Sequence, residues 1–97
     1  MIKLRILSDR RDSVDVVKSA ILAEQKRLEI SLQSTEQKIR AFEERYNTSS
    51  EVFLSRFAAE DLTGGDVEYI AWSGELKIRD RLREELKDLK DIEYVVN

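Results

Sequence analysis

Hydrophobic and polar residues follow two different patterns along the chain, and the change between them marks the expected elements. Residues 2–7 alternate between apolar and basic side chains, which indicates a short strand with one covered face. The alternation returns over residues 92–96. Between these segments the apolar residues recur every three or four positions, which is the period of an α-helix. We therefore expect a mainly α protein with a short β-strand at each terminus.

The longest helical pattern covers residues 13–46. Ten positions in it are separated by steps of three or four residues, and eight of the ten are apolar. Such a narrow stripe, kept over more than four heptads, is typical of a coiled coil rather than of a globular helix. Asp9 or Asp12 is expected to cap the start of this helix. The ten positions are Val14, Val17, Ile21, Glu24, Leu28, Leu32, Thr35, Ile39, Phe42 and Tyr46.

A polar break follows the long helix and predicts a second, shorter one. Thr48 and Glu51 have the spacing of a capping box, which favours a helix over residues 49–60. Gly64 is expected to end this segment in a left-handed conformation. The apolar face of the short helix consists of Val52, Phe53 and Phe57.

A third helix is expected over residues 67–91, with Asp66 as its cap. Gly74 lies in its interior, where glycine costs about 1 kcal/mol relative to alanine. Close approach of another helix, or space for Trp72, would offset that cost. The apolar repeat of this helix consists of Ile70, Ala71, Gly74, Ile78, Leu82, Leu86 and Leu89.

The simplest arrangement of these elements is one antiparallel helical hairpin. Its 97 residues form a single domain, because so short a chain cannot build two cores. The short middle helix is expected to fill the length difference at the tip, and both strands emerge at the opposite end, where they can pair. One helical pair and a two-stranded ribbon leave apolar surface uncovered. We therefore expect a homodimer, with a seam formed by Val17, Ile21, Leu28 and Leu32.

Composition narrows the class of protein further. Charged residues make up 38% of the chain and apolar residues 41%, which suits long helices with one apolar stripe. Proline is absent and glycine occurs three times, so the turns that an all-β sandwich needs are missing. No stretch is long and apolar enough for a transmembrane helix, and residues 1–7 are too short for a signal peptide. A cytoplasmic protein is expected.

The residue types present also exclude several chemistries. The chain has no histidine and no cysteine, which removes zinc fingers, cysteine nucleophiles, histidine bases and disulfide frameworks. Its carboxylates show no paired arrangement in an apolar setting. We expect neither enzyme activity nor a cofactor or metal site.

The charge distribution argues against nucleic-acid binding. The net charge is −3, so a nucleic-acid binder would need a segregated basic patch. Lys77, Arg79, Arg81 and Arg83 are spaced by two residues, which sends them to different sides of a helix, and acidic residues interleave with them. These residues are expected to form a solvated ion-pair surface.

The aromatic residues gather at the expected tip of the hairpin. Six of the seven lie within residues 42–72. They form a local core that holds three helix ends together, a docking surface, or both, with Phe53 and Phe57 inside and Tyr69 or Trp72 partly exposed. Residues 47–66 carry a net charge of −3, which serves either solubility or the attraction of a basic partner. The six aromatic residues are Phe42, Tyr46, Phe53, Phe57, Tyr69 and Trp72.

The segment from Tyr46 to Phe53, followed by Phe57, Asp61-Leu62, Gly65-Asp66 and residues 68–72, carries a resemblance to a known group. Over roughly residues 42–76 the chain resembles small prokaryotic coiled-coil proteins, cyanobacterial ones among them, that are encoded beside compact toxin-like proteins and regarded as antitoxins. Members of the group often have an acidic residue directly before the tryptophan, where this chain has Ala71. The resemblance implies a protein that neutralises a cognate toxin by direct contact.

Two functions follow from these observations. The first is an antitoxin-type binding protein whose partner docks on the tip. The second is a structural coiled-coil adaptor or assembly subunit with no toxin partner. The candidate partner-binding residues at the tip are Phe53, Phe57, Asp61, Asp66, Tyr69 and Trp72.

Overall fold

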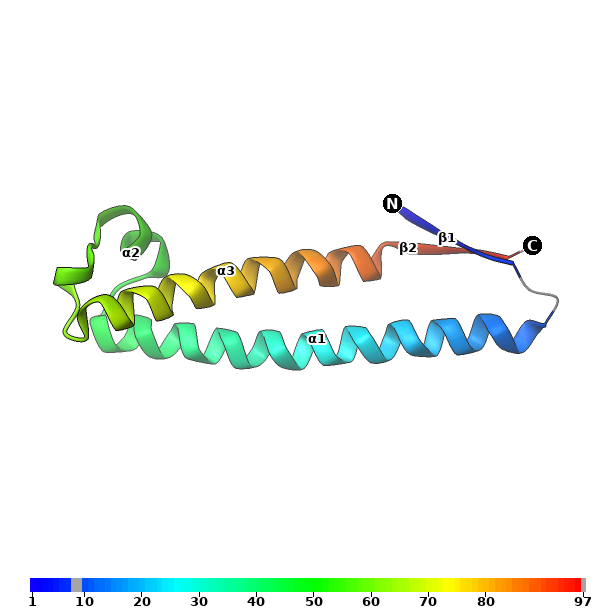
Figure 1. Ribbon diagram of the computed structural model, residues 1–97, viewed down its shortest axis with the longest axis horizontal. Helices are drawn as coiled ribbons and strands as arrows, with labels where there is room; N and C mark the ends of the chain where they lie inside the picture. The colour runs from blue at the N-terminus through cyan, green and yellow to red at the C-terminus, as the bar shows by residue number, and fades with distance from the viewer. Residues whose placement is uncertain (8–9, 97) are drawn as a thin grey trace.

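The computed structural model, which describes residues 1–7 and 10–96, is built on one long antiparallel helical hairpin (Figure 1). The expected fold class is confirmed: the protein is mainly α, with a short helix at the tip and a strand at each terminus. The molecule measures 61 × 20 × 18 Å. In chain order the elements are β1 (Ile2–Ile6), α1 (Arg11–Tyr46), α2 (Ser50–Arg56), the 3₁₀ helix η1 (Ala59–Asp61), α3 (Gly65–Lys90) and β2 (Ile92–Val96).

The apolar stripe of α1 faces α3, as its heptad spacing predicts. All ten predicted positions are buried or half-buried. Near the middle of the hairpin Leu28 packs with Leu82 and Leu86, and nearer the tip Ile39 joins a second buried cluster that includes Leu76. The narrow stripe is therefore used within the chain, because α3 runs along most of it.

The inward face of α3 differs from the predicted one in the half nearest the tip. Leu82 and Leu86 are buried as expected, but Ile70 is 68% exposed and Ile78 is 39% exposed. Trp72 and Leu76 are buried in their place. This part of α3 carries apolar side chains on two faces, and turning Trp72 inward removes more apolar surface from water than turning Ile70 inward.

The start of α2 is set by a different residue from the predicted one. Asn47 ends α1 in the left-handed conformation, with φ of 48°, which asparagine tolerates better than most residues. The N-cap of α2 is then Ser49, whose hydroxyl accepts a hydrogen bond from the Val52 N–H at 3.2 Å. Thr48 is not the cap, because it still belongs to the turn that closes α1: its N–H donates to the Glu43 carbonyl at 3.0 Å.

The segment between α2 and α3 also departs from the prediction. Helix α2 ends at Arg56, and the chain turns through η1 before α3 begins. The left-handed glycine is Gly65, with φ of 60°, whereas Gly64 has φ of −85° and is the N-cap of α3. Asp66 lies in the first turn of α3, where its charge favours the helix dipole without capping it.

The start of α1 was predicted to be capped by Asp9 or Asp12. The N-cap is Arg10, and Asp12 lies in the first turn of the helix. Asp9 lies outside the described residues.

The two strands pair in parallel at the end of the hairpin away from the tip, with Ile2 opposite Ile92 and Ile6 opposite Val96. They also fill the length difference between the helices, which the sequence assigned to α2. Gln25 of α1 donates its side-chain N–H to the carbonyl of Leu89 at 3.3 Å, so α1 continues beyond the end of α3. Beside that continuation runs β2, which extends the line of α3 (Figure 1), and the Lys18 ammonium lies 5.1 Å from the centre of the Tyr94 ring.

Across the part of the chain that the structure describes, no helix has an apolar stretch sufficient to span a membrane.

Candidate functional site at the tip

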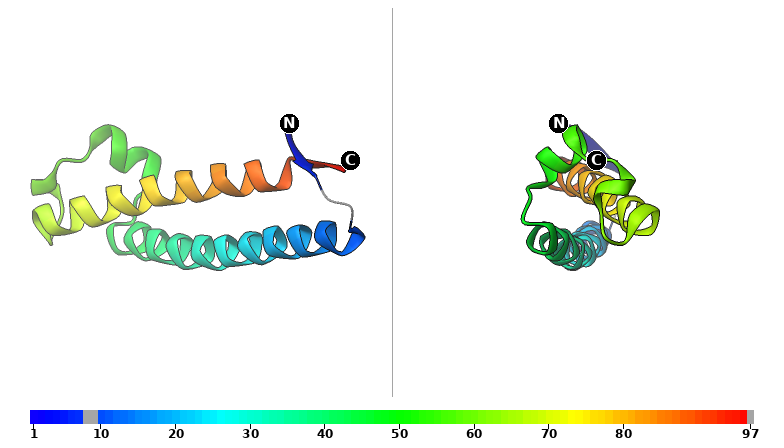
Figure 2. Two further views of the ribbon diagram at one scale, coloured as in Figure 1. Left: turned by 45° about the vertical axis from the view of Figure 1, so that its right-hand side comes forward. Right: turned by 90° about the vertical axis from the view of Figure 1, so that its left-hand side faces the viewer.

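The tip is organised around the indole of Trp72, which is completely buried. Phe53 stacks on it with ring centres 3.9 Å apart and planes 4° from parallel. Phe42 and Tyr46 of α1 stack at 5.6 and 5.9 Å. Viewed along the hairpin axis, α1, α2 and α3 surround a common centre at this end (Figure 2). The cluster, which we call the tip core, also contains Ile39, Phe57, Leu62, Tyr69 and Leu76.

A chain of hydrogen bonds ties the three helices together beneath this stack. The Trp72 indole N–H donates to the Ser50 hydroxyl at 3.1 Å. The Ser50 hydroxyl and backbone N–H both donate to one carboxylate oxygen of Glu43, at 2.9 and 3.0 Å. Each helix supplies one member of the chain. Each buried polar side-chain atom in this chain of bonds has a hydrogen-bond partner. Burying Ser50 and the indole N–H therefore leaves no polar group unsatisfied.

A second polar cluster closes the end of the hairpin around Glu68 of α3. Its carboxylate accepts hydrogen bonds from the Arg45 guanidinium and the Tyr46 hydroxyl of α1. It also accepts from the backbone N–H of Gly64 at 3.0 Å. The Glu68 side chain is only 15% exposed, and its bonds connect the start of α3 to the end of α1.

The predicted tip residues divide into a buried and an exposed set. Phe53 and Trp72 are fully buried and Phe57 and Tyr69 are half-buried. Of the two residues expected to be partly exposed, Tyr69 is half-buried, whereas Trp72 is fully buried because the indole fills the space between three helices. The aromatic residues form a local core, which was one of the interpretations left open.

The two predicted acidic residues of the tip are both exposed. One of them also has a structural role, since the Asp61 carboxylate accepts a hydrogen bond from the Ala58 N–H at 2.7 Å and so stabilises the turn into η1. Asp66 presents its charge to solvent in the first turn of α3.

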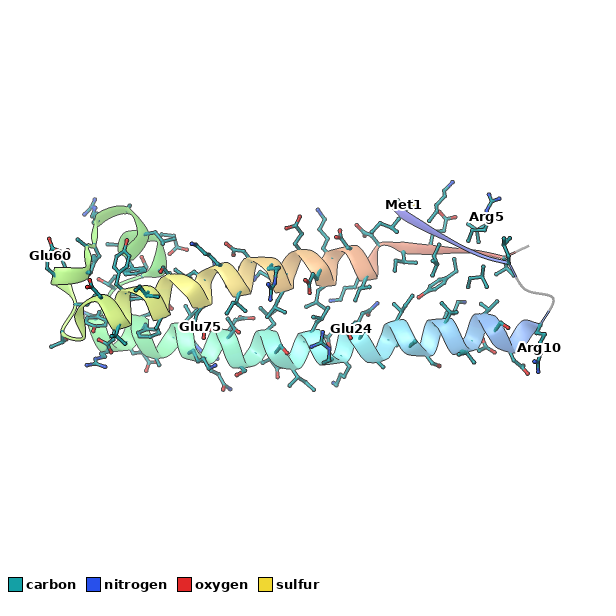
Figure 3. All side chains as sticks on the ribbon, in the orientation of Figure 1. Met1, Arg5, Arg10, Glu24, Glu60 and Glu75 are labelled. Atoms are coloured by element: carbon teal, nitrogen blue, oxygen red, sulfur yellow. The ribbon has the colours of Figure 1, made fainter. Side chains whose placement is uncertain are left out.

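The tip presents to solvent one apolar side chain that the sequence pattern did not single out, Leu54, and one that it placed on the inward face of the short helix, Val52. Leu54 is 58% exposed and Val52 is 37% exposed, both on α2. Acidic residues accompany them on α2 and η1, and Glu60 lies at the far end of the molecule (Figure 3). Leu54 lies outside the aromatic pattern that indicates the tip, and the usable signal in the sequence is that a leucine directly after Phe53 cannot share its inward face. We define the tip surface as Glu51, Val52, Leu54, Glu60 and Asp61.

A groove runs between α1 and α3 beside the tip core. It has a volume of 420 Å³, and Ala41, Phe42 and Ala71 form its apolar lining. Ion pairs between the helices border it, Lys38 with Glu75 at 3.7 Å and Arg45 with Glu68. The Glu75 side chain points from α3 toward α1 (Figure 3). The groove is open to solvent and has the character of a contact surface.

The residues of the predicted dimer seam are largely covered within the chain. Leu28 is 2% exposed, because Leu82 and Leu86 of α3 pack on it, and Leu32 packs against the same cluster. Val17 and Ile21 are half-buried. Leu28 is therefore not an uncovered position, since α3 already occupies the place assigned to a second copy.

Among the residues that the structure describes, the only carboxyl group with a shifted pKa is that of Glu24, which lies outside the tip. The Arg27 guanidinium donates to both carboxylate oxygens of Glu24, and this hydrogen bonding lowers the pKa of the Glu24 carboxyl. No three acidic side chains within residues 1–7 and 10–96 come together as a possible metal site. The chemistry that the tip offers is thus apolar contact, hydrogen bonding and negative charge.

Comparisons with protein-family models, with curated proteins and with solved structures found no match for this chain.

Proposed function

We propose that the protein is an antitoxin-type binding module that neutralises a cognate toxin by direct contact through the tip surface. The observation that carries the proposal is the exposure of Leu54 and Val52 on a short helix that a stacked aromatic core holds in place. Exposed apolar side chains framed by charged ones are typical of contact sites for other proteins. The resemblance of residues 42–76 to antitoxin components supports the choice of partner.

Rigidity and charge both suit the tip surface to this role. Helix α2 has 7 residues and would not be stable alone, but Phe53 and Ser50 anchor it to α3 and α1. A surface ordered before binding loses less conformational entropy in the complex. The net charge of −3 over residues 47–66 would attract a basic partner and speed the encounter. In this proposal the protein works in the cytoplasm, where such a toxin would act.

The proposal is tested by co-expression with the product of the adjacent gene, followed by growth rescue and co-purification. Leu54→Ser is expected to weaken binding by about 2 kcal/mol, or about 30-fold in affinity, if Leu54 fills a pocket on the partner. Leu22→Ser is the matched control, because Leu22 is 62% exposed but lies in the half of α1 away from the tip. Wild-type binding by the Leu54 variant, with its helices retained by circular dichroism, would overturn the proposal.

The negative charge is tested separately. Changing Glu51 and Glu60 together to glutamine preserves size and removes two charges from the tip surface. Association is expected to slow and to lose part of its salt dependence, whereas dissociation changes little. An unchanged association rate at low salt would show that charge does not guide the partner to the tip.

A structural adaptor is the second candidate, favoured by the elongated shape of the molecule and by its length of 61 Å. An adaptor would bind its partners along the hairpin or at the strands, so its function would tolerate changes to the tip surface. A variant impaired at Leu22 but not at Leu54 would support this alternative.

A further inference from the structure

The half of α3 nearest the tip leaves one apolar face uncovered. Val67 is 78% exposed, Ile70 is 68% exposed and Ile78 is 39% exposed, and helical spacing places all three on the side opposite Trp72. Gly74 lies between them. A Cβ atom on Gly74 would meet nothing within 4 Å, so packing inside the chain does not require a glycine there. We call the row Val67, Ile70, Gly74, Ile78 and Arg81 the α3 stripe.

The spacing of residues in the α3 stripe is symmetric about its centre. Its steps are three, four, four and three residues, with Gly74 at the centre. If two such helices crossed antiparallel at Gly74, Ile70 of each would face Ile78 of the other, and Val67 would face the aliphatic part of Arg81. This is the self-complementary pattern that a two-fold interface requires. A glycine at the crossing point lets two helices approach closely. Such a crossing would explain why position 74 is a glycine, which packing within the single chain does not explain.

Charge is compatible with the same orientation. The end of the stripe at Val67 adjoins the exposed carboxylate of Asp66, and its other end carries the exposed side chains of Lys77 and Arg81, of which Arg81 also pairs with Glu85 at 3.9 Å. An antiparallel crossing brings the acidic end of each copy to the basic end of the other. A parallel crossing would place like charges side by side, which is unfavourable.

The surface area of the chain leaves room for a contact of this kind. The accessible surface is 7090 Å² for a mass of 11.3 kDa. A typical folded monomer of that mass exposes about 5,700 Å². The excess of about 1,400 Å² is larger than the roughly 800 Å² that each partner loses in a standard interface.

We propose that a second copy of this chain covers the α3 stripe, with the two α3 helices crossing antiparallel at Gly74 about a two-fold axis. The surface differs from the seam on α1 that the sequence suggested and from the tip surface on α2 and η1. The dimer is therefore independent of the proposed toxin contact, and either can fail without the other.

The mass of the wild-type protein in solution is the first test. Light scattering at about 100 µM is expected to give twice the 11.3 kDa chain mass. Ile70→Glu should raise the dimer dissociation constant by about 100-fold or more, because the contacts of Ile70 with Ile78 are lost twice and two carboxylates must be desolvated in an apolar interface. Ile30→Glu is the matched control, since Ile30 is 58% exposed but lies on α1 outside the stripe.

Introduced cysteines give the orientation, because the chain contains none of its own. A mixture of the Val67→Cys and Arg81→Cys proteins should form a disulfide between the two variants under mild oxidation. Gly74→Cys should link to itself across the two-fold axis. Both positions outside the centre are exposed in the single chain, so neither change disturbs its core.

A monomeric wild-type protein would overturn the proposal. So would a dimer that survives Ile70→Glu and separates with Ile30→Glu, because the interface would then lie on α1. Disulfides in the separate Val67→Cys and Arg81→Cys samples, with none between the two in the mixture, would show a parallel crossing and refute the arrangement.

Discussion

Trp72 and Ser50 are joined by a hydrogen bond from the indole N–H to the serine hydroxyl, inside a site where both side chains are buried. The Ser50 hydroxyl in turn donates a hydrogen bond to the Glu43 carboxylate. A bond between α3 and α2 is thereby extended to α1. Together with the stacking of Phe53 on Trp72, this small side chain sets the orientation of the short helix relative to the hairpin.

We predict that Ser50→Ala lowers the free energy of unfolding by about 1–3 kcal/mol, because the indole N–H and the Glu43 carboxylate both lose a buried partner. Ser55→Ala is the control in the same helix. Its hydroxyl bonds only to the Val52 carbonyl at an exposed position, so the effect should stay within about 0.5 kcal/mol. Urea unfolding followed by circular dichroism measures both. An equal decrease in the free energy of unfolding for the two variants would show that the buried hydrogen bonds of Ser50 stabilise the protein no more than the exposed bond of Ser55.

Gly65 gives a second stability prediction, because its φ of 60° lies in the left-handed region. Gly65→Ala is expected to cost about 1–2 kcal/mol, the penalty of a Cβ atom in this conformation. Gly65→Asn should cost less, since asparagine tolerates that region better. Thermal unfolding of the two variants compares them directly. A more stable alanine variant would mean that the turn before α3 rearranges to an ordinary helical φ.

The architecture of the hairpin could be predicted because α1 carries a single apolar stripe. Leu28 and Ile39 stand in a heptad pattern with polar neighbours, so only one face can be buried. In α3 the same rule fails, because Ile70 and Trp72 offer two apolar faces to the core. Their periodicity is equally helical, and only the fit of the indole against Phe53 decides between them.

The location of the site was predictable, but its exposed members were not. Aromatic residues clustered in the sequence indicated the tip, and they do meet there. Which of them face solvent depends on α2, whose position is set by the contact of Phe53 with Trp72 and by the Ser50 bonds. A seven-residue helix has too few positions for a clear periodic pattern, so the only signal for the exposure of Leu54 is its position directly after Phe53.

The Glu24–Arg27 pair on the surface of α1 should make a contribution to stability that depends on pH. The hydrogen bonds from Arg27 lower the pKa of Glu24 in the folded protein. A carboxyl with a lowered folded pKa stabilises the protein above its unfolded pKa, and the contribution is lost as the pH falls through the folded pKa. Arg27→Gln should raise the Glu24 pKa toward its usual range. Titration of the Glu24 carboxyl by NMR in both proteins checks this, and identical pKa values would show that the pair does not persist in solution.

The last prediction concerns the two terminal strands, which form a parallel pair with Leu4 opposite Tyr94. A two-stranded sheet is marginal in water, and here it gains support from α1, where Lys18 lies over the Tyr94 ring. Val95→Pro removes a ladder N–H, because the parallel register directs the Val95 N–H toward the Leu4 carbonyl, so the amides of residues 2–6 should lose protection from hydrogen exchange, by about tenfold or more.

Glu93→Ala is the matched control for the proline variant, because Glu93 is exposed on the same strand and its change keeps the backbone N–H. Protection in residues 2–6 should then stay within about twofold of the wild-type value. The amides around Trp72 serve as an internal reference, since the tip core lies at the other end of the hairpin. If Val95→Pro left residues 2–6 protected, β1 would have to be paired with something other than β2, and the sheet would not be closed within one chain.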